Sequence, residues 1–236
     1  EKAGVYLAYG EQSSWLYGQT GNAGKANQGG NALVNQSIGA YFTKKLSNDF
    51  YASTVLQATR YGVTSSMVGG NTLYTTGFGF LGSLEIGQPF EIYSKQLTVT
   101  PEAQVVVQQI QLEDSSFNGT NVRYSNTPIW TSRLGIRLAT ESEADAEGPK
   151  SKAWMTLNAY STDGAAPGAT FSAATGLVSS VTSSKLAGFV GGVQVGVSGD
   201  LTKSWSGTVA VNYLQGMPSS PVGLGLGGQA VIRYCF

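Results

Sequence analysis

Hydrophobic and polar residues alternate along most of this chain, most clearly in its second half. Between positions 205 and 214, Val209 and Val211 alternate with Thr208 and Asn212. Because successive side chains of a β-strand point to opposite faces, this two-residue period predicts strands with one apolar and one polar face. Ten such runs cover most of the sequence, with almost no helix, at residues 3–9, 33–45, 50–63, 73–87, 97–112, 129–140, 152–161, 187–201, 205–214 and 223–236.

The length of these runs favours strands that cross a membrane. Several are 11 to 16 residues long, whereas soluble strands usually have about 5–6 residues and a tilted membrane strand needs about 9–11. No run of 18 apolar residues is present, so a membrane-spanning helix is not expected. Aromatic residues at strand ends would lie at the membrane interfaces, including Trp15, Tyr61, Tyr93, Trp205 and Tyr213.

The connections between the runs differ in length on the two sides of the predicted sheet. Bacterial barrels have short periplasmic turns and longer outer loops. With the C-terminus at the periplasmic rim, the outer set is 10–32, 64–72, 113–128, 162–186 and 215–222, and the inner set is 46–49, 88–96, 141–151 and 202–204. Only the acidic segment 141–151 is long for its side. This pattern predicts an all-β fold, an antiparallel transmembrane β-barrel with ten strands visible here; a soluble β-sandwich is the alternative.

The last strand ends on an aromatic residue. Ile232, Tyr234 and Phe236 share one face, and Arg233 and Cys235 share the other. This ending resembles the C-terminal strand of bacterial outer-membrane β-barrels, in which the assembly machinery reads a final Phe two residues after another aromatic. The resemblance implies that Ile232, Tyr234 and Phe236 form a C-terminal assembly signal.

Composition narrows the chemistry of this chain. Its 236 residues include 14 Lys and Arg, 14 Asp and Glu, no His and one Cys. The zero net charge argues against a nucleic-acid partner. Without His, the usual serine or cysteine triad is absent, and one Cys excludes an intramolecular disulfide or a multi-cysteine metal site. We therefore expect no enzyme activity, no catalytic residue, no cofactor and no metal, and interpret Cys235 as an inert lumen or rim residue.

Five charged residues lie opposite the apolar face of the cleaner predicted strands: Glu85, Glu102, Arg133, Arg137 and Arg233. A charge that faces lipid at mid-depth costs about 2–4 kcal/mol, so this placement predicts a wet lumen. One interpretation is general polarity that keeps the lumen hydrated. The other is a paired belt that packs against a threaded segment or closes the pore. The sequence leaves both open.

Three motifs follow one another in the middle of the chain: SLEIGQPF at 83–90, PEAQ at 101–104 and RLGIRL at 133–138. In this order, and with the terminal Phe, they resemble the β-domain of type V secretion autotransporters. Weaker similarity extends from Gly4 to Phe236. Other barrels share the last strand but are not expected to share this middle block.

The resemblance implies a function and partners. The chain would be an outer-membrane translocator of a Gram-negative bacterium that inserts as a β-barrel and delivers an N-terminal passenger domain to the cell surface. Its partners would be outer-membrane lipid, the outer-membrane β-barrel assembly machinery and the upstream passenger domain. The alternative is a free-standing porin-like or adhesion β-barrel with ligand-binding surface loops.

The family barrel has twelve strands and a helix that lies in the pore. Residues 4–10 resemble its third strand, which implies that 1–236 is the β-barrel domain without the first two strands and the pore helix. A smaller closed barrel of ten strands is the alternative. Some members cleave their own linker with acidic lumen residues, for which Glu85 and Glu102 would be the candidates, but no counterpart of the cleaved helix is recognised.

Overall fold

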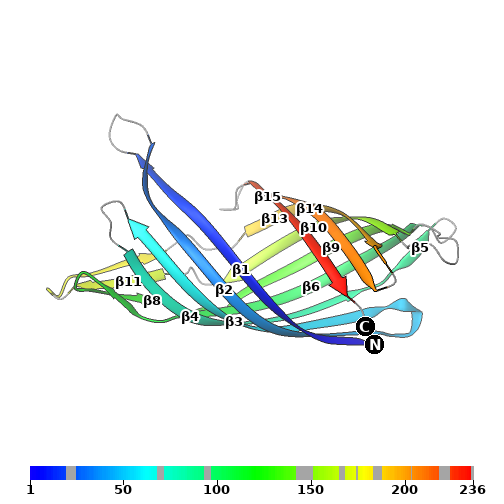
Figure 1. Ribbon diagram of the computed structural model, residues 1–236, viewed down its shortest axis with the longest axis horizontal. Helices are drawn as coiled ribbons and strands as arrows, with labels where there is room; N and C mark the ends of the chain where they lie inside the picture. Colours follow the sequence, from blue (N-terminus) through cyan, green and yellow to red (C-terminus); the bar gives the residue numbers. More distant parts are fainter. Residues whose placement is uncertain are drawn as a thin grey trace.

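A computed structural model shows one long antiparallel sheet that curls into a half-barrel (Figure 1). It describes residues 1–19, 25–67, 72–92, 97–141, 151–164, 168–173, 175–182, 188–202, 204–217 and 224–234. Ten long strands follow one another in chain order across this sheet: β1 (Lys2–Gln19), β2 (Lys25–Lys45), β3 (Tyr51–Met67), β4 (Thr72–Gly87), β6 (Leu97–Leu112), β9 (Ile129–Glu141), β10 (Ser151–Gly164), β13 (Gly188–Asp200), β14 (Trp205–Gly216) and β15 (Leu224–Tyr234). The predicted all-β antiparallel class is confirmed.

The apolar side chains of this sheet lie on its outside rather than in a core. Val5 and Leu226 are each 81% exposed. The buried apolar residues of the described chain are Val122, Ala139 and Ala210. Burial from water drives the folding of soluble proteins, so an apolar exterior fits a sheet whose outer face contacts lipid.

The strand register assigns each side chain to one face. Val195 pairs with Val211 on the outer face and is 46% exposed, whereas its neighbour Gln194 pairs with Asn212 on the inner face. The alternation predicted for the second half of the chain therefore has the predicted orientation.

The structure also assigns the faces of β2 and β3, where the alternation in sequence is irregular. Ile38 and Leu56 are 59% and 62% exposed on the outer face. Ser37 and Thr59 are buried on the inner face, and their hydroxyl oxygens lie 2.8 Å apart in a hydrogen bond. Hydroxyl pairs of this kind stabilise a polar wall across strands.

On the inner face, several aromatic rings lie over glycines of the neighbouring strand. A Cβ added to Gly4 would come within 2.6 Å of the Tyr41 ring, and one added to Gly87 within 2.5 Å of the Tyr51 ring. The missing side chains therefore make room for the rings to lie along the wall. The same arrangement recurs at Gly39 with Tyr6, Gly79 with Tyr61, and Gly196 with Trp154.

These contacts correct one expectation about the interface aromatics. Tyr61 lies on the inner face over Gly79, not at the membrane interface. Trp205 does lie on the outer face, with its ring centroid 4.8 Å from that of Tyr234. Tyr93 lies outside the described residues.

Both termini lie at the end of the half-barrel that carries the short turns (Figure 1). A 3-10 helix, Ser47–Asp49, joins β2 to β3 there. A short strand, β5 (Phe90–Ile92), follows β4 and pairs with the beginning of β6. The acidic connection at 142–150 lies outside the described residues.

The first long connection differs from the prediction. Residues 10–32 were expected to form a loop, but β1 and β2 continue through most of this segment and stay paired from Lys2 with Thr43 to Gln19 with Lys25. The register shifts between Leu16 and Tyr17, which marks a bulge. Local glycines suggested a loop, whereas the cross-strand hydrogen-bond ladder extends the strands; propensity is a weak guide where strands pair.

Two other predicted loops build a second sheet. The segments 113–128 and 162–186 contain β7 (Ser115–Phe117), β8 (Thr120–Tyr124), β11 (Gly168–Ala173) and β12 (Val178–Thr182). These strands pair in the order β12-β11-β8-β7, beyond the end of the half-barrel opposite the termini (Figure 1). Val122, which is 2% exposed, lies at the centre of this outer sheet.

The long sheet has two edges. Within the described residues, β1 pairs only with β2, and β15 pairs only with β14. No helix in the described part of the chain is long and apolar enough to cross a membrane.

Candidate functional site on the inner wall

A cluster of charged side chains lies on the inner wall where β4, β6 and β9 run side by side. Arg133 bridges two carboxylates: its Nη2 donates to Glu85 Oε2 at 2.7 Å, and its Nη1 donates to Glu102 Oε2 at 3.2 Å. Three of the five charges expected in the lumen are thus brought together. We call Glu85, Glu102 and Arg133 the luminal triad.

Uncharged partners complete the hydrogen bonding of the triad. Arg133 Nε donates to Gln104 Oε1 at 2.9 Å, and Nη1 also donates to Asn158 Oδ1 at 3.0 Å. The Tyr51 hydroxyl approaches Glu85 Oε1 at 2.9 Å and Glu102 Oε1 at 3.3 Å. The guanidinium is therefore held by four side chains in a fixed orientation.

Glycines in the neighbouring strands create the space for this cluster. Glu102 pairs with Gly87 of β4 on one side and with Gly135 of β9 on the other. A Cβ on Gly135 would approach Asn158 Oδ1 at 2.7 Å, and one on Gly87 would collide with the Tyr51 ring. Large side chains therefore alternate with glycines along this cross-strand row.

The three motifs singled out in the sequence meet at this point. Glu85 and Gly87 belong to the first, Glu102 and Gln104 to the second, and Arg133 with Gly135 to the third. In each motif, the residues two apart face the inner wall because side chains alternate across a strand. The apolar residues between them, such as Leu134 at 67% exposure, face outward.

The triad is removed from most of the solvent. The side chains of Arg133 and Glu102 are 13% and 6% exposed, and that of Glu85 is 25% exposed. Removing one partner of a buried ion pair leaves an uncompensated charge and is strongly destabilising. One cation faces two carboxylates, so the cluster has a formal charge of minus one and spare acceptor capacity on its carboxylate oxygens.

Arg137 does not join the triad. Its guanidinium carbon lies 4.6 Å from the ring centroid of Trp154, a cation–π geometry that stabilises a partly desolvated cation. Its buried Nε has no hydrogen-bond partner among the described residues. Arg137 lies four residues beyond Arg133 on β9, and Trp154 lies four residues before Asn158 on β10, so both are nearer the termini on the same inner face.

The other sequence candidates lie in β15. The register pairs Arg233 with Ser206, but its side chain lies outside the described residues. Ile232 is 70% and Tyr234 46% exposed, both on the outer face. Phe236 and Cys235 lie outside the described residues, so the final aromatic of the assembly signal stays a prediction.

Alternation along the strands predicted that Glu85, Glu102 and Arg133 share one face, but it did not show which charges meet, nor that Tyr51, Gln104 and Asn158 contact them. These residues are uncharged, and nothing local marks them as partners of Arg133. Gly87 and Gly135 are the signal that could have found these partners. A glycine that pairs with a charged residue across two strands leaves space that a large side chain of a neighbouring strand can fill. Within the described chain, no group of three or more His, Cys, Asp or Glu side chains is placed to hold a metal ion.

Comparison with known proteins matches this architecture. The family model of the autotransporter β-domain matches residues 2–212. The crystal structure of the β-domain of the Bordetella autotransporter BrkA is similar, with a TM-score of 0.68 and 18% identity over 98% of this chain and 84% of that one. The transport unit of the autotransporter AIDA-I from Escherichia coli has a TM-score of 0.67 and 15% identity over 99% and 84% of the two chains. At these identities, the structures show the shared fold.

Proposed function

This chain belongs to the autotransporter β-domain family, and we propose that it delivers an N-terminal passenger domain across the outer membrane to the cell surface. Family membership makes the chain an outer-membrane β-barrel domain of type V secretion with a translocator role. The observation that carries the finer proposal is the inner wall, where the three motifs bring their charged residues together rather than leave them scattered.

The luminal triad suits contact with a chain inside the pore. Its carboxylate oxygens keep spare acceptor capacity while Arg133 stays locked to four partners. We therefore propose that the triad stays fixed in the wall and accepts hydrogen bonds from donor groups of the segment that joins the barrel to the passenger. Preorganised polar groups of this kind bind without reorganising first.

The two unpaired edges support a larger barrel. Lipid does not tolerate unpaired backbone groups, so a membrane sheet closes on itself. We propose that the barrel contains two further strands between β15 and β1 and a helix in its pore, giving twelve strands. Insertion would use the assembly machinery through Ile232, Tyr234 and Phe236.

The test is carried out on the full gene. An epitope placed in the segment encoded upstream of Glu1 is detected with antibody on intact cells. Surface staining that disappears after external protease treatment supports passenger delivery. A signal peptide directly before Glu1, or an epitope that stays in the periplasm, contradicts it and favours the free-standing porin-like or adhesion barrel.

A further inference from the structure

Lys44 and Gln36 delimit an apolar stretch of the outer face on β2. On β2, the outward residues between Lys44 and Gln36 are Phe42, Ala40 and Ile38. Eight residues of strand rise about 27 Å, or about 20 Å along the membrane normal for a strand tilted by about 40°. This is close to the height of the apolar band of membrane barrels, about 25 Å, so Lys44 and Gln36 mark its two boundaries.

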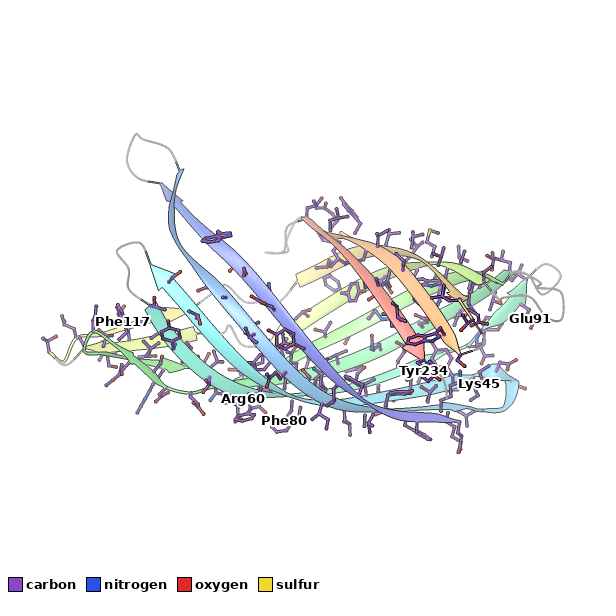
Figure 2. All side chains as sticks on the ribbon, viewed as in Figure 1. Lys45, Arg60, Phe80, Glu91, Phe117 and Tyr234 are labelled. Atoms are coloured by element: carbon purple, nitrogen blue, oxygen red, sulfur yellow. The ribbon has the colours of Figure 1, made fainter. Side chains whose placement is uncertain are left out.

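Arg60 lies at the boundary far from the termini. It pairs with Gln36 of β2 and with Phe78 of β4 in one cross-strand row. Figure 2 shows Arg60 and Phe80 projecting from the convex, lipid-facing side of the sheet. Its side chain is exposed, and the described part of the chain provides it with neither a hydrogen bond nor an ion pair.

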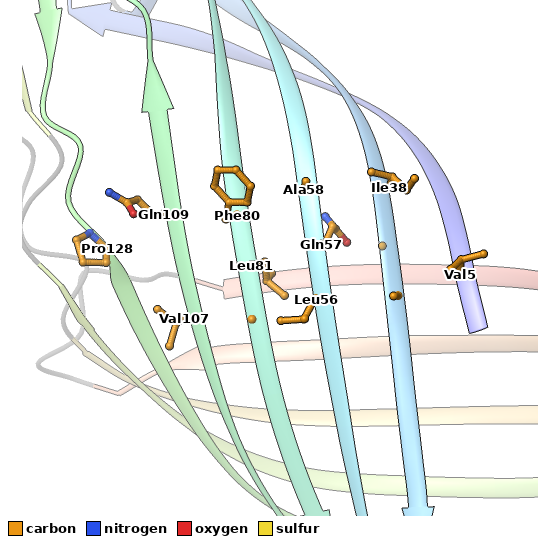
Figure 3. Close-up of a pocket in the computed structure, with 13 residues that line it drawn as sticks. Val5, Ile38, Leu56, Gln57, Ala58, Phe80, Leu81, Val107, Gln109 and Pro128 are labelled. Carbon is orange, nitrogen blue, oxygen red and sulfur yellow. The ribbon is translucent and has the colours of Figure 1, made fainter. Parts of the chain in front are cut away.

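An apolar groove runs along the same outer face, next to Arg60 on the side of the termini. Its volume is about 690 Å³, and its walls include Leu56, Ile38 and Phe80, with Ala58 on its floor (Figure 3). A second hollow of about 450 Å³ shares Ile38 and Ala58 with the groove and is lined by Arg60 at its upper end. The two hollows adjoin at Ile38 and Ala58 and together extend from the apolar stretch to Arg60, and we call them the surface channel.

We propose that this channel is a binding site for a phosphorylated, acylated lipid of the external leaflet. An acyl chain lies in the groove between Leu56 and Phe80, and a phosphate group accepts hydrogen bonds from the Arg60 guanidinium. Arginine matches phosphate with two parallel donors, and basic pockets beside apolar surface are where membrane proteins hold lipid headgroups. The external leaflet follows from the orientation proposed above, with the termini in the periplasm.

Charge complementarity distinguishes this channel from a further apolar hollow that described residues form on the outer face. That hollow, of about 510 Å³, lies near the termini between Val209, Leu201 and Ile232. Among the described residues that line it, none is Arg or Lys. Apolar shape alone accepts any acyl chain, whereas Arg60 adds selectivity for an anionic headgroup.

The experiment measures lipid bound to the protein expressed from its full gene and extracted in mild detergent. Native mass spectrometry titrates purified lipid A and dephosphorylated lipid A against wild type, Arg60→Gln, Arg60→Lys and Ala58→Trp. Lys44→Gln is the matched control, because it removes an exposed outward cation at the other boundary. Heat-modifiable gel mobility verifies that each variant is folded.

Wild type is expected to bind lipid A in preference to dephosphorylated lipid A, because the Arg60 guanidinium donates hydrogen bonds to the phosphate group. Arg60→Gln is expected to weaken lipid A binding by at least about tenfold, as for loss of a hydrogen bond to a charged group. Arg60→Lys keeps most of the affinity, Ala58→Trp fills the groove and loses it, and Lys44→Gln matches wild type. Equal binding by wild type and Arg60→Gln, or equal binding of lipid A and dephosphorylated lipid A by wild type, overturns the proposal. If Ala58→Trp does not fold, Arg60→Gln decides alone. Failure of passenger display would not affect this binding measurement.

Discussion

At the scale of single residues, the inner wall depends on one cation. Only 6% of the Glu102 side chain is exposed. Its carboxylate tolerates this burial because it accepts hydrogen bonds from Arg133 and the Tyr51 hydroxyl. An unpaired carboxylate at that position would lose most of its hydration without compensation. Arg133 therefore supplies the positive charge that both carboxylates of the wall contact.

Replacing Arg133 with Met should destabilise the folded barrel by about 3 kcal/mol, at the low end for a buried pair because Glu85 is partly exposed. Glu102→Gln should lower the stability by less, since Arg133 keeps its ion pair with Glu85. Urea unfolding in detergent micelles of both variants and of the double variant gives the coupling energy, which we expect to be about 1–3 kcal/mol. Additive effects would show that the two side chains do not depend on each other.

The two faces of β13 allow a second test at this scale. Val195→Arg puts a charge into lipid near mid-depth and should lower stability by about 2–4 kcal/mol, whereas Gln194→Arg faces the wet inner wall and should be tolerated. Folding into lipid vesicles is measured for both variants. Similar losses would contradict the register that pairs Val195 with Val211.

At the scale of elements, the sequence predicted the membrane strands better than the outer ones. Apolar and polar residues alternate along strands such as β13 and β14 because one face contacts lipid and the other water. This pattern can be recognised within each strand by itself. The outer sheet has no such signal. Its β8 and β11 pair Tyr124 with Ala169, a contact between two connections that no two-residue period reveals. The glycines of the first connection likewise hid the long β1–β2 hairpin.

The hairpin between β11 and β12 provides a test of sidedness. Leu177 and Leu46 are 75% and 47% exposed, at opposite ends of the half-barrel. In a Cys235→Ser background, Leu177→Cys should react with a membrane-impermeant maleimide on intact cells, and Leu46→Cys should react only after the outer membrane is permeabilised. The opposite labelling pattern would invert the topology and move Arg60 to the inner leaflet.

At the scale of the whole molecule, the open edges are the main feature that the sequence alone did not settle. Strand alternation predicts strands but not their total number, and the expectation of twelve came from family resemblance. The structure leaves β1 and β15 each with one paired side among the described residues.

With two strands between them, β1 and β15 would be about 14 Å apart, well beyond the roughly 7 Å that a disulfide spans between Cα atoms. In the Cys235→Ser protein made from the full gene, Val5→Cys paired with a cysteine at any position from 226 to 232 should not cross-link on oxidation. Val197→Cys with Val209→Cys, on adjacent strands, is the positive control. Efficient cross-linking of β1 to β15 would indicate a closed barrel of ten strands.

The rings that lie over Gly4, Gly39 and Gly87 have a consequence for how wide the conduit is. At each of these positions the glycine has no side chain, so the aromatic ring lies flat against the strand. The ring therefore extends into the lumen by its thickness and not by its length. A methyl group at Gly87 would push the Tyr51 ring away from the wall and into the lumen. Gly87→Ala is therefore expected to narrow the lumen of the closed barrel.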